Sequence, residues 1–162
     1  MRKKIIRLRA PRAGDMGRVV QLHGELYARE FGYDTTFEAL VAGIAAGFVR
    51  DFDPKRERCW IAAMDGEVVG SVFLVKQSLN KAKLRLLIVD PKARGQGLGR
   101  RLTRACIAFA RKKRYRKIVL WTQSHLAAAR AIYQAENFKL KSKEKHFSFG
   151  KRLVAETWEL RL

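Results

Sequence analysis

The spacing of apolar residues changes from a helical period to an extended one about a third of the way along the chain. Apolar positions first recur every three or four residues, in two sets: Val19, Leu22, Leu26 and Tyr27, then Phe37, Leu40, Val41, Ile44 and Phe48. We therefore predict a short strand at 5–9, a helix that Asp15 can cap and that ends near 32–34, and a second helix opened by the capping box Thr35-x-x-Glu38.

Extended segments dominate after the turn at Asp53-Pro54. Strands are expected at 59–63, 67–75 and 83–89, and Asp65-Gly66 between the first two is typical of a hairpin turn. The rest of the chain predicts helices at 98–114 and 126–136 and strands at 118–122, 138–145 and 153–162.

The resulting order is β-α-α-β-β-β-α-β-α-β-β. This order indicates a mixed α/β fold whose sheet is mostly antiparallel in its first half. We expect a single domain over 1–162, because no linker-like stretch and no internal repeat interrupts the 162 residues.

Composition narrows the class of protein. Hydrophobic residues make up 48% of the chain, which is enough for a folded core. Apolar runs are too short to cross a bilayer and the N-terminal residues do not resemble a signal peptide, so we expect a cytoplasmic protein without membrane contact. The two cysteines, Cys59 and Cys106, and the three histidines have no ligand spacing, which favours reduced thiols and no metal site.

A glycine-rich segment, Arg94-Gly-Gln-Gly-Leu-Gly99, lies between a predicted strand and a predicted helix. A helix N-terminus offers unpaired N–H groups and the positive end of the helix dipole. Glycines at 95, 97 and 99 would let a pyrophosphate approach those donors, and Arg100 and Arg101 would add charge.

Other interpretations of this segment fit less well. A dinucleotide-binding fingerprint needs G-x-G-x-x-G in a βαβ unit and an acidic residue after the next strand, whereas the glycines here are spaced G-x-G-x-G and 115–125 has no acidic residue. The Walker loop needs Gly-Lys-Ser/Thr, which is absent from this segment. A turn without a ligand is the remaining alternative, but three glycines opening a helix would then only destabilise it.

Two motifs resemble those of a known family. Arg94-x-x-Gly97-x-Gly99 resembles the acetyl-CoA motif Q/R-x-x-G-x-G/A of the GNAT (Gcn5-related) N-acetyltransferases, and Tyr133-x-x-x-Asn137-Phe138 resembles their Y-x-x-x-G-F. The order of elements is similar to the acyl-CoA N-acyltransferase (GNAT) fold over the whole chain. Segments such as 56–60 and 120–122 also resemble the acetyltransferase half of proteins that fuse a MarR-type DNA-binding domain to a GNAT domain.

The resemblance implies an enzyme that moves the acetyl group of acetyl-CoA to a primary amine by direct attack. It implies that the pantetheine arm of acetyl-CoA pairs with the backbone of Ile88 and Val89. The remaining contacts to acetyl-CoA would come from Arg94, Gly95, Gln96, Gly97, Leu98, Gly99 and Arg100. A backbone N–H within 87–89 would stabilise the oxyanion. Tyr133 would be the general acid, although a core role on one helix face with Leu126 and Ala129 is the alternative.

The general base stays open. Many relatives have a Glu on the strand before the loop, but 83–89 contains none, which leaves His23, Glu25, Glu30 or a water chain. The sequence also departs from the family at Leu126, where many relatives have Asn, and at Asn137, which replaces Gly and is tolerated if it only adopts a left-handed cap.

Thirty-five Lys and Arg against 15 Asp and Glu give a formal charge of +20. The segment 111–117 can complement a helix dipole, and four lysines that alternate along one predicted strand would share a solvated face: Lys139, Lys141, Lys143 and Lys145. Alternatively, these faces dock an acidic protein or nucleic acid.

The acceptor is expected to be a small-molecule or protein amine and not a free polyamine, because the positive field repels cations. Aromatic residues near the first helices and the last hairpin either line its site or belong to the core: Phe31, Tyr33, His146 and Phe147. A homodimer is left open. A rival to the enzyme is a non-catalytic acyl-CoA-sensing or nucleic-acid-associated module.

Overall fold

The computed structural model describes residues 4–162, and a seven-stranded sheet forms its centre. The strands are β1 (Ile6–Arg9), β2 (Arg58–Met64), β3 (Glu67–Lys76), β4 (Lys81–Val89), β5 (Lys117–Gln123), β6 (Lys139–Ser148) and β7 (Lys151–Arg161). Their order in space is β1-β2-β3-β4-β5-β7-β6, and each neighbouring pair is antiparallel except β4–β5. The mixed α/β class and the predicted order of elements are confirmed.

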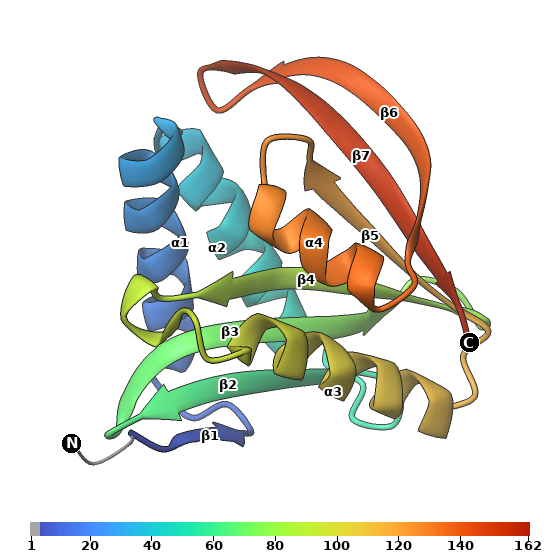
Figure 1. Ribbon diagram of the computed structural model, residues 1–162. Coiled ribbons are helices and arrows are strands. Elements are labelled where there is room, and N and C mark those ends of the chain that lie inside the picture. The colour runs from blue at the N-terminus through green and yellow to red at the C-terminus, as the bar shows by residue number, and fades with distance from the viewer. Residues whose placement is uncertain (1–3) are drawn as a thin grey trace.

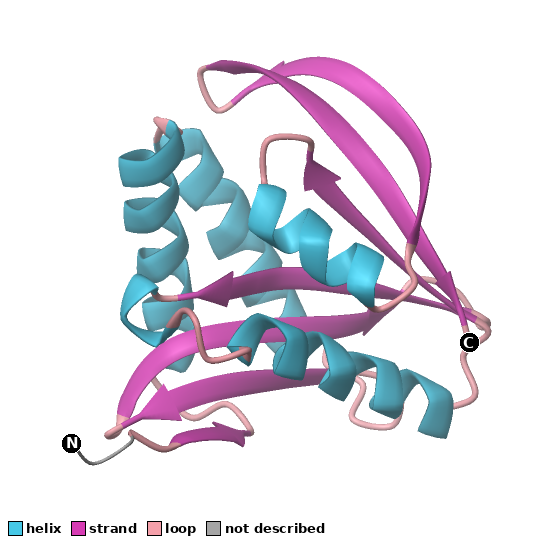
Figure 2. Cartoon of the chain, in the orientation of Figure 1, coloured by secondary structure: helices cyan, strands magenta, loops and turns pink. Residues whose placement is uncertain are grey.

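Helices cover both faces of this sheet (Figure 1). They are α1 (Asp15–Phe31), α2 (Thr35–Arg50), α3 (Leu98–Lys112) and α4 (Ala127–Ala135), with one 3-10 turn, η1 (Pro91–Ala93). The larger core lies under α3 and α4, and two smaller groups of buried side chains lie under α1 and α2 on the opposite face. Figure 2 shows the loops that connect these helices and strands. None of the four α-helices is long and apolar enough to cross a membrane.

The two predicted N-terminal caps are wrong by one residue. Gly14, with φ 92°, caps α1 without a side-chain hydrogen bond, whereas the carboxylate of Asp15 accepts the Arg12 N–H at 2.6 Å and pairs with Arg9. Asp34 caps α2, since its extended backbone lets Oδ1 accept the Thr36 N–H at 3.0 Å. The caps differ from the prediction because the carboxylates of Asp15 and Asp34 accept hydrogen bonds from N–H groups that the helical period alone does not indicate.

The C-terminal signals are confirmed. Gly32 ends α1 in the left-handed conformation, with φ 69°, and its N–H bonds to the carbonyl of Ala28. Asn137 is also left-handed, with φ 68°, and its N–H bonds to the carbonyl of Gln134 just after α4. Replacing the family's Gly by Asn therefore preserves this turn.

The four lysines of β6 do not share one face, contrary to the prediction. A bulge shifts the register between Leu140 and Ser142, so Lys139 lies opposite Glu159 of β7 while Lys143 lies opposite Glu156. Odd and even positions of β7 face opposite sides of the sheet. The bulge therefore divides the lysine row between the two faces.

Candidate active site

The sheet opens between its two parallel strands. β4 and β5 pair only at Lys81–Lys117, Ala82–Ile118 and Lys83–Val119, after which β5 continues with β7 and β4 with β3. The backbone edge of β4 from 84 to 89 therefore has no strand beside it on the β5 side, and Figure 1 shows the two strands diverging there.

A bulge in β4 lies inside this opening. Ser71 pairs with Ile88, but Phe73 pairs with Arg85, so β4 contains one extra residue between them. Leu86 has φ 50°, an unusual conformation for a bulky residue, and its carbonyl accepts the Ser71 hydroxyl at 2.9 Å. Strained backbone of this kind is frequent at functional sites.

The register shows which backbone groups of β4 face the opening. Asp90 donates its N–H to the carbonyl of Val69 at 2.7 Å, so Asp90 and, two residues earlier, Ile88 direct their backbone groups toward β3. Val89 lies between them and directs its N–H and C=O away from β3. Of the two predicted backbone contacts, Val89 thus has its polar groups in the opening, while the side chain of Ile88 packs against Leu22 and Leu26.

The glycine-rich loop leads from β4 into α3. Gly95 and Gly97 have φ 75° and 71°, and Gly97 caps α3 without a side-chain hydrogen bond. Among the described residues, no protein acceptor takes a hydrogen bond from the backbone N–H groups of 95–100; the first N–H of this helix to bond internally is that of Arg101, to Gly97 at 3.0 Å. Six successive N–H groups at the positive end of a helix form a suitable site for an anion.

Gly99 has a different role from the other two glycines. A Cβ at Gly99 would lie 2.7 Å from Cδ1 of Ile132 in α4, whereas a Cβ at Gly95 or Gly97 would meet nothing within 4 Å. Gly99 therefore allows α4 to pack closely on α3. Leu98 beside it is a core residue, 3% exposed.

The arginines around the loop contact protein groups. Arg94 forms a two-pronged pair with Glu30 of α1, with Nη1 to Oε1 at 2.8 Å. Arg100 lies 2.6 Å from Glu136, and Arg101 donates to the carbonyl of Ile6. The additional charge expected from Arg100 and Arg101 is thus directed at neighbouring elements.

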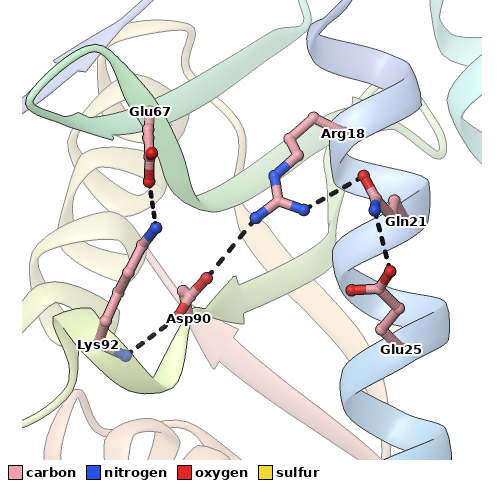
Figure 3. Close-up of polar contacts among 6 residues, drawn as sticks. All are labelled: Arg18, Gln21, Glu25, Glu67, Asp90 and Lys92. Atoms are coloured by element: carbon pink, nitrogen blue, oxygen red, sulfur yellow. Dashed lines mark hydrogen bonds and ion pairs between the residues drawn. The ribbon is translucent and has the colours of Figure 1, made fainter.

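Polar contacts hold α1 against the end of β4 just before the loop (Figure 3). Arg18 lies between Asp90, at 3.8 Å, and Gln21, at 3.2 Å, while Asp90 also accepts the Lys92 N–H at 3.0 Å. Gln21 donates to Glu25 at 2.9 Å, so this carboxylate bonds along the surface of α1. Surface contacts of this kind contribute little stability singly, but they position the loop relative to α1.

A cavity of about 560 Å³ lies at the opening, between β4, β5 and the helices α1, α2 and α4. Its walls are mainly apolar and aromatic, with a few polar groups. The residues that matter below are His23, Tyr27, Tyr33, Phe37, Lys83, Arg85, Leu126, Ala129, Tyr133 and Phe149.

Tyr133 is buried at this cavity, 4% exposed. Its ring packs against Phe138 and Trp158, with centroids 5.6 and 6.4 Å away. Burial raises the pKa of the phenol above its ordinary value. No hydrogen bond joins the hydroxyl to another described residue. The packing of the ring is therefore compatible with a role as general acid, which stays a prediction.

The candidate bases differ in position. His23 lies at the cavity wall, but it is 2% exposed and a ring nitrogen donates to the carbonyl of Val19 at 2.8 Å. Burial lowers its pKa to about 4. Glu30 is paired with Arg94 and Glu25 bonds to Gln21. The described lining contains no carboxylate.

Of the aromatic residues proposed for the acceptor side, Tyr33 alone lines this cavity. Its hydroxyl lies 2.8 Å from Nε2 of His125, whose ring also packs on Phe31. His146 bonds to Gln123 at 2.9 Å, and Phe147 is 71% exposed.

Sequence reasoning did not place three aromatic residues at the site. Tyr27, Phe37 and Phe149 gather only when the helices meet the β6–β7 turn. Alternation along the predicted strand could have placed Lys83 and Arg85 on one face, but it could not show that this face borders a cavity.

The chain is similar to known proteins in both sequence and fold. The model of the acetyltransferase (GNAT) family matches residues 23–138. N-acetyltransferase 8B of Homo sapiens is 35% identical over 100 residues, covering 59% of this chain and 44% of the relative. N-acetylaspartate synthetase of Xenopus tropicalis is 36% identical over 81 residues, covering 49% and 30%. The chain thus spans less than half the length of these curated relatives.

Solved structures share the fold. A ribosomal-protein-alanine N-acetyltransferase from Brucella melitensis superposes with a TM-score of 0.77 at 19% identity, over 96% of this chain and 99% of that one. A protein from Salmonella typhimurium, solved with its cofactor acetyl-CoA, gives 0.73 at 17% identity, over 96% and 93%. The family model, which matches most of the chain, identifies this protein as a member of the GNAT acetyltransferase family.

Proposed function

We propose that the chain transfers the acetyl group of acetyl-CoA to a primary amine by direct attack of the amine. One observation carries this proposal: the opening between β4 and β5 joins the unpaired N–H groups of the glycine loop to a cavity that contains a buried tyrosine hydroxyl. Membership of the GNAT family and the acetyl-CoA in a structural neighbour support it.

The residues at the opening fit this donor. Pyrophosphate is an anion that the N–H groups of 95–100 can hold, and the left-handed glycines 95 and 97 leave open space above them. The N–H and C=O of Val89 can pair with an amide-bearing arm in the manner of an added strand. Acetyl-CoA, when bound, supplies the acetyl group as a thioester.

The chain's own groups then serve the transfer. The amine nitrogen forms the new N–C bond, the C–S bond breaks, and Tyr133 donates its phenolic proton to the departing sulfur. We assign oxyanion stabilisation to a backbone N–H within 87–89 that the arm leaves unpaired. The amine's proton leaves through solvent, since the described lining offers no carboxylate and His23 is neutral and bonded to Val19.

Release of coenzyme A against a panel of amines tests this function. We expect amine-dependent release that follows formation of an acetylated amine, at rates above those measured without an acceptor. If the protein binds acetyl-CoA tightly but none of the amines increases the release of coenzyme A, then the rival, a non-catalytic acyl-CoA-sensing module, takes its place.

The acidic partner and the nucleic acid remain predictions from composition, and the homodimer is left open. The bulge in β6 divides the lysines that were expected to form one docking face. A polyanion bound through the remaining charge would dissociate steeply as salt is raised.

A further inference from the structure

Two cations of β4 line the cavity without a counter-ion. Lys83 and Arg85 are both half-buried. No Asp or Glu of residues 4–162 forms an ion pair with either of them. The other basic side chains near the site behave differently, because Arg94 and Arg100 are each paired with a glutamate.

Both side chains project to the same face of the sheet. Lys83 lies opposite Val75 and Arg85 opposite Phe73, two residues of β3 that pack on the α1 and α2 side. This face is opposite to the one covered by α3, the helix that begins at the glycine loop. Lys83 is also the last residue of β4 that pairs with β5, so the two cations lie where the opening begins.

Lys83 and Arg85 lie too far from the glycine loop to bind the pyrophosphate of the donor. Four to six residues of extended chain separate them from Val89 at the loop end of β4, which corresponds to about 13–20 Å. The loop carries its own anion site in the N–H groups of 95–100.

The positive charges of Lys83 and Arg85 lie in an electrostatically unfavourable environment. Burial lowers the pKa of Lys83, and the neighbouring charge of Arg85 lowers it further. Burial also lowers the pKa of Arg85. Half-buried like charges without a partner destabilise a fold, and an anion between them would remove that repulsion.

The remaining wall of the cavity is mainly apolar. Tyr27, Tyr33, Phe37 and Phe149 form a mutually packed group with ring centroids 4.5–5.4 Å apart between Tyr27 and Phe37, Tyr27 and Tyr33, and Phe37 and Phe149. This wall suits a hydrophobic body, while the cations suit one negative group.

Building on the proposed acetyl transfer, we propose that the acceptor is a small primary amine that carries a carboxylate, in the form of an amino acid with an apolar side chain, and that Lys83 and Arg85 bind this carboxylate. The guanidinium of Arg85 offers two parallel donors to a carboxylate, and Lys83 adds a point charge. The aromatic wall receives the side chain of the amino acid.

Matched acceptors test the carboxylate. The panel pairs each common apolar amino acid with its amide, compared at equal concentration of unprotonated amine, with release of coenzyme A as the readout. We expect kcat/KM to be about 10- to 100-fold higher for the acid than for the amide, the range for a hydrogen bond to a charged group. The difference should lie mainly in KM, since the carboxylate is bound before and during the transfer alike.

Variants then locate the effect. Lys83→Gln and Arg85→Gln should reduce the preference for the acid to near unity, whereas Lys83→Arg and Arg85→Lys should retain part of it. Lys139→Gln removes the same charge from exposed β6 and should leave the preference intact. Equal turnover of acids and amides, or a loss of both in Lys83→Gln and Arg85→Gln variants that still fold, would overturn the proposal.

Direct binding separates this inference from the proposed function. Calorimetric titration of the protein, with coenzyme A present, should detect the amino acid and not its amide, and Arg85→Gln should abolish the heat. If no amine is acetylated but the acid still binds through Arg85, acetyl transfer fails and the carboxylate site stands. If amines are acetylated but acids and amides bind alike, the reverse holds.

Discussion

Replacing Tyr133 by Phe removes one oxygen atom from the wall of the cavity and leaves the ring that packs on Phe138 and Trp158. Because no described residue bonds to the hydroxyl, its loss breaks no contact in the folded protein. We therefore expect the free energy of unfolding to change by about 1 kcal/mol or less. A loss of activity in a variant that folds this well would then reflect the chemical step and not unfolding.

The size of the kinetic effect follows from the role of a general acid. Proton transfer by a positioned side chain contributes about 10²–10⁴-fold, so kcat should fall at least about 100-fold, or about 3 kcal/mol in the barrier. KM for acetyl-CoA should stay within about twofold, because the loop N–H groups and Val89 are untouched. Since burial raises the pKa of Tyr133, the wild-type rate should show no loss from ionisation of this phenol up to about pH 10.

Steady-state release of coenzyme A from pH 6 to 10 measures both effects, and urea denaturation of the two proteins measures folding. Tyr27→Phe is a matched control, since Tyr27 lines the same cavity and its buried phenol also has a raised pKa, about 12. A Tyr133→Phe enzyme that keeps wild-type kcat, or one that slows no more than Tyr27→Phe, would show that Tyr133 is a packing residue only.

Two further predictions concern stability. Burial lowers the pKa of His23 to about 4 in the folded protein, against 6.5 when unfolded, so the unfolded chain binds more protons below pH 6.5. Stability should fall by about 2 kcal/mol from pH 7 to 5 through this residue, and His23→Phe should flatten that part of the urea-derived profile; an unchanged slope would contradict the assignment. Gly97→Ala and Gly14→Ala place alanine at left-handed helix caps with open surroundings, and each should cost about 1–2 kcal/mol of unfolding free energy. Calorimetry should show weaker coenzyme A binding for Gly97→Ala alone, and equal binding by both variants would remove the loop from the donor site.

The order of elements and most of their bounds follow from local patterns in the sequence. Apolar spacing, Asp65-Gly66, Gly32 and Asn137 each act within a few residues, and each gave the observed structure. The predicted ends of elements were less accurate. Helix α3 ends at Lys112 and not at 114, and β6 continues past 145 to Ser148. At those positions, a helix cap or pairing with a distant strand determines where the element ends.

Side-chain partners across elements were beyond local patterns. The sequence indicates that Arg100 follows the glycine loop, but only the packing of α3 on α4 places Glu136 beside it. Similarly, Gly99 matches the family motif, and the structure shows that its absent side chain makes room for Ile132. A motif records which residue is present and not which of several physical needs it meets.

The sequence by itself determined the glycine loop at the start of α3, the tyrosine four residues before Asn137, and the order of strands and helices around them. These depend on periodicity and backbone preference, which act over a few neighbouring residues. The tertiary structure alone decided that β4 and β5 separate after Lys83, that a bulge lies at Leu86 and Val89 faces the opening, and that Lys83 and Arg85 border a cavity whose described lining has no carboxylate. Each of those features depends on register between strands and on packing between elements far apart in the chain, and no local pattern encodes either.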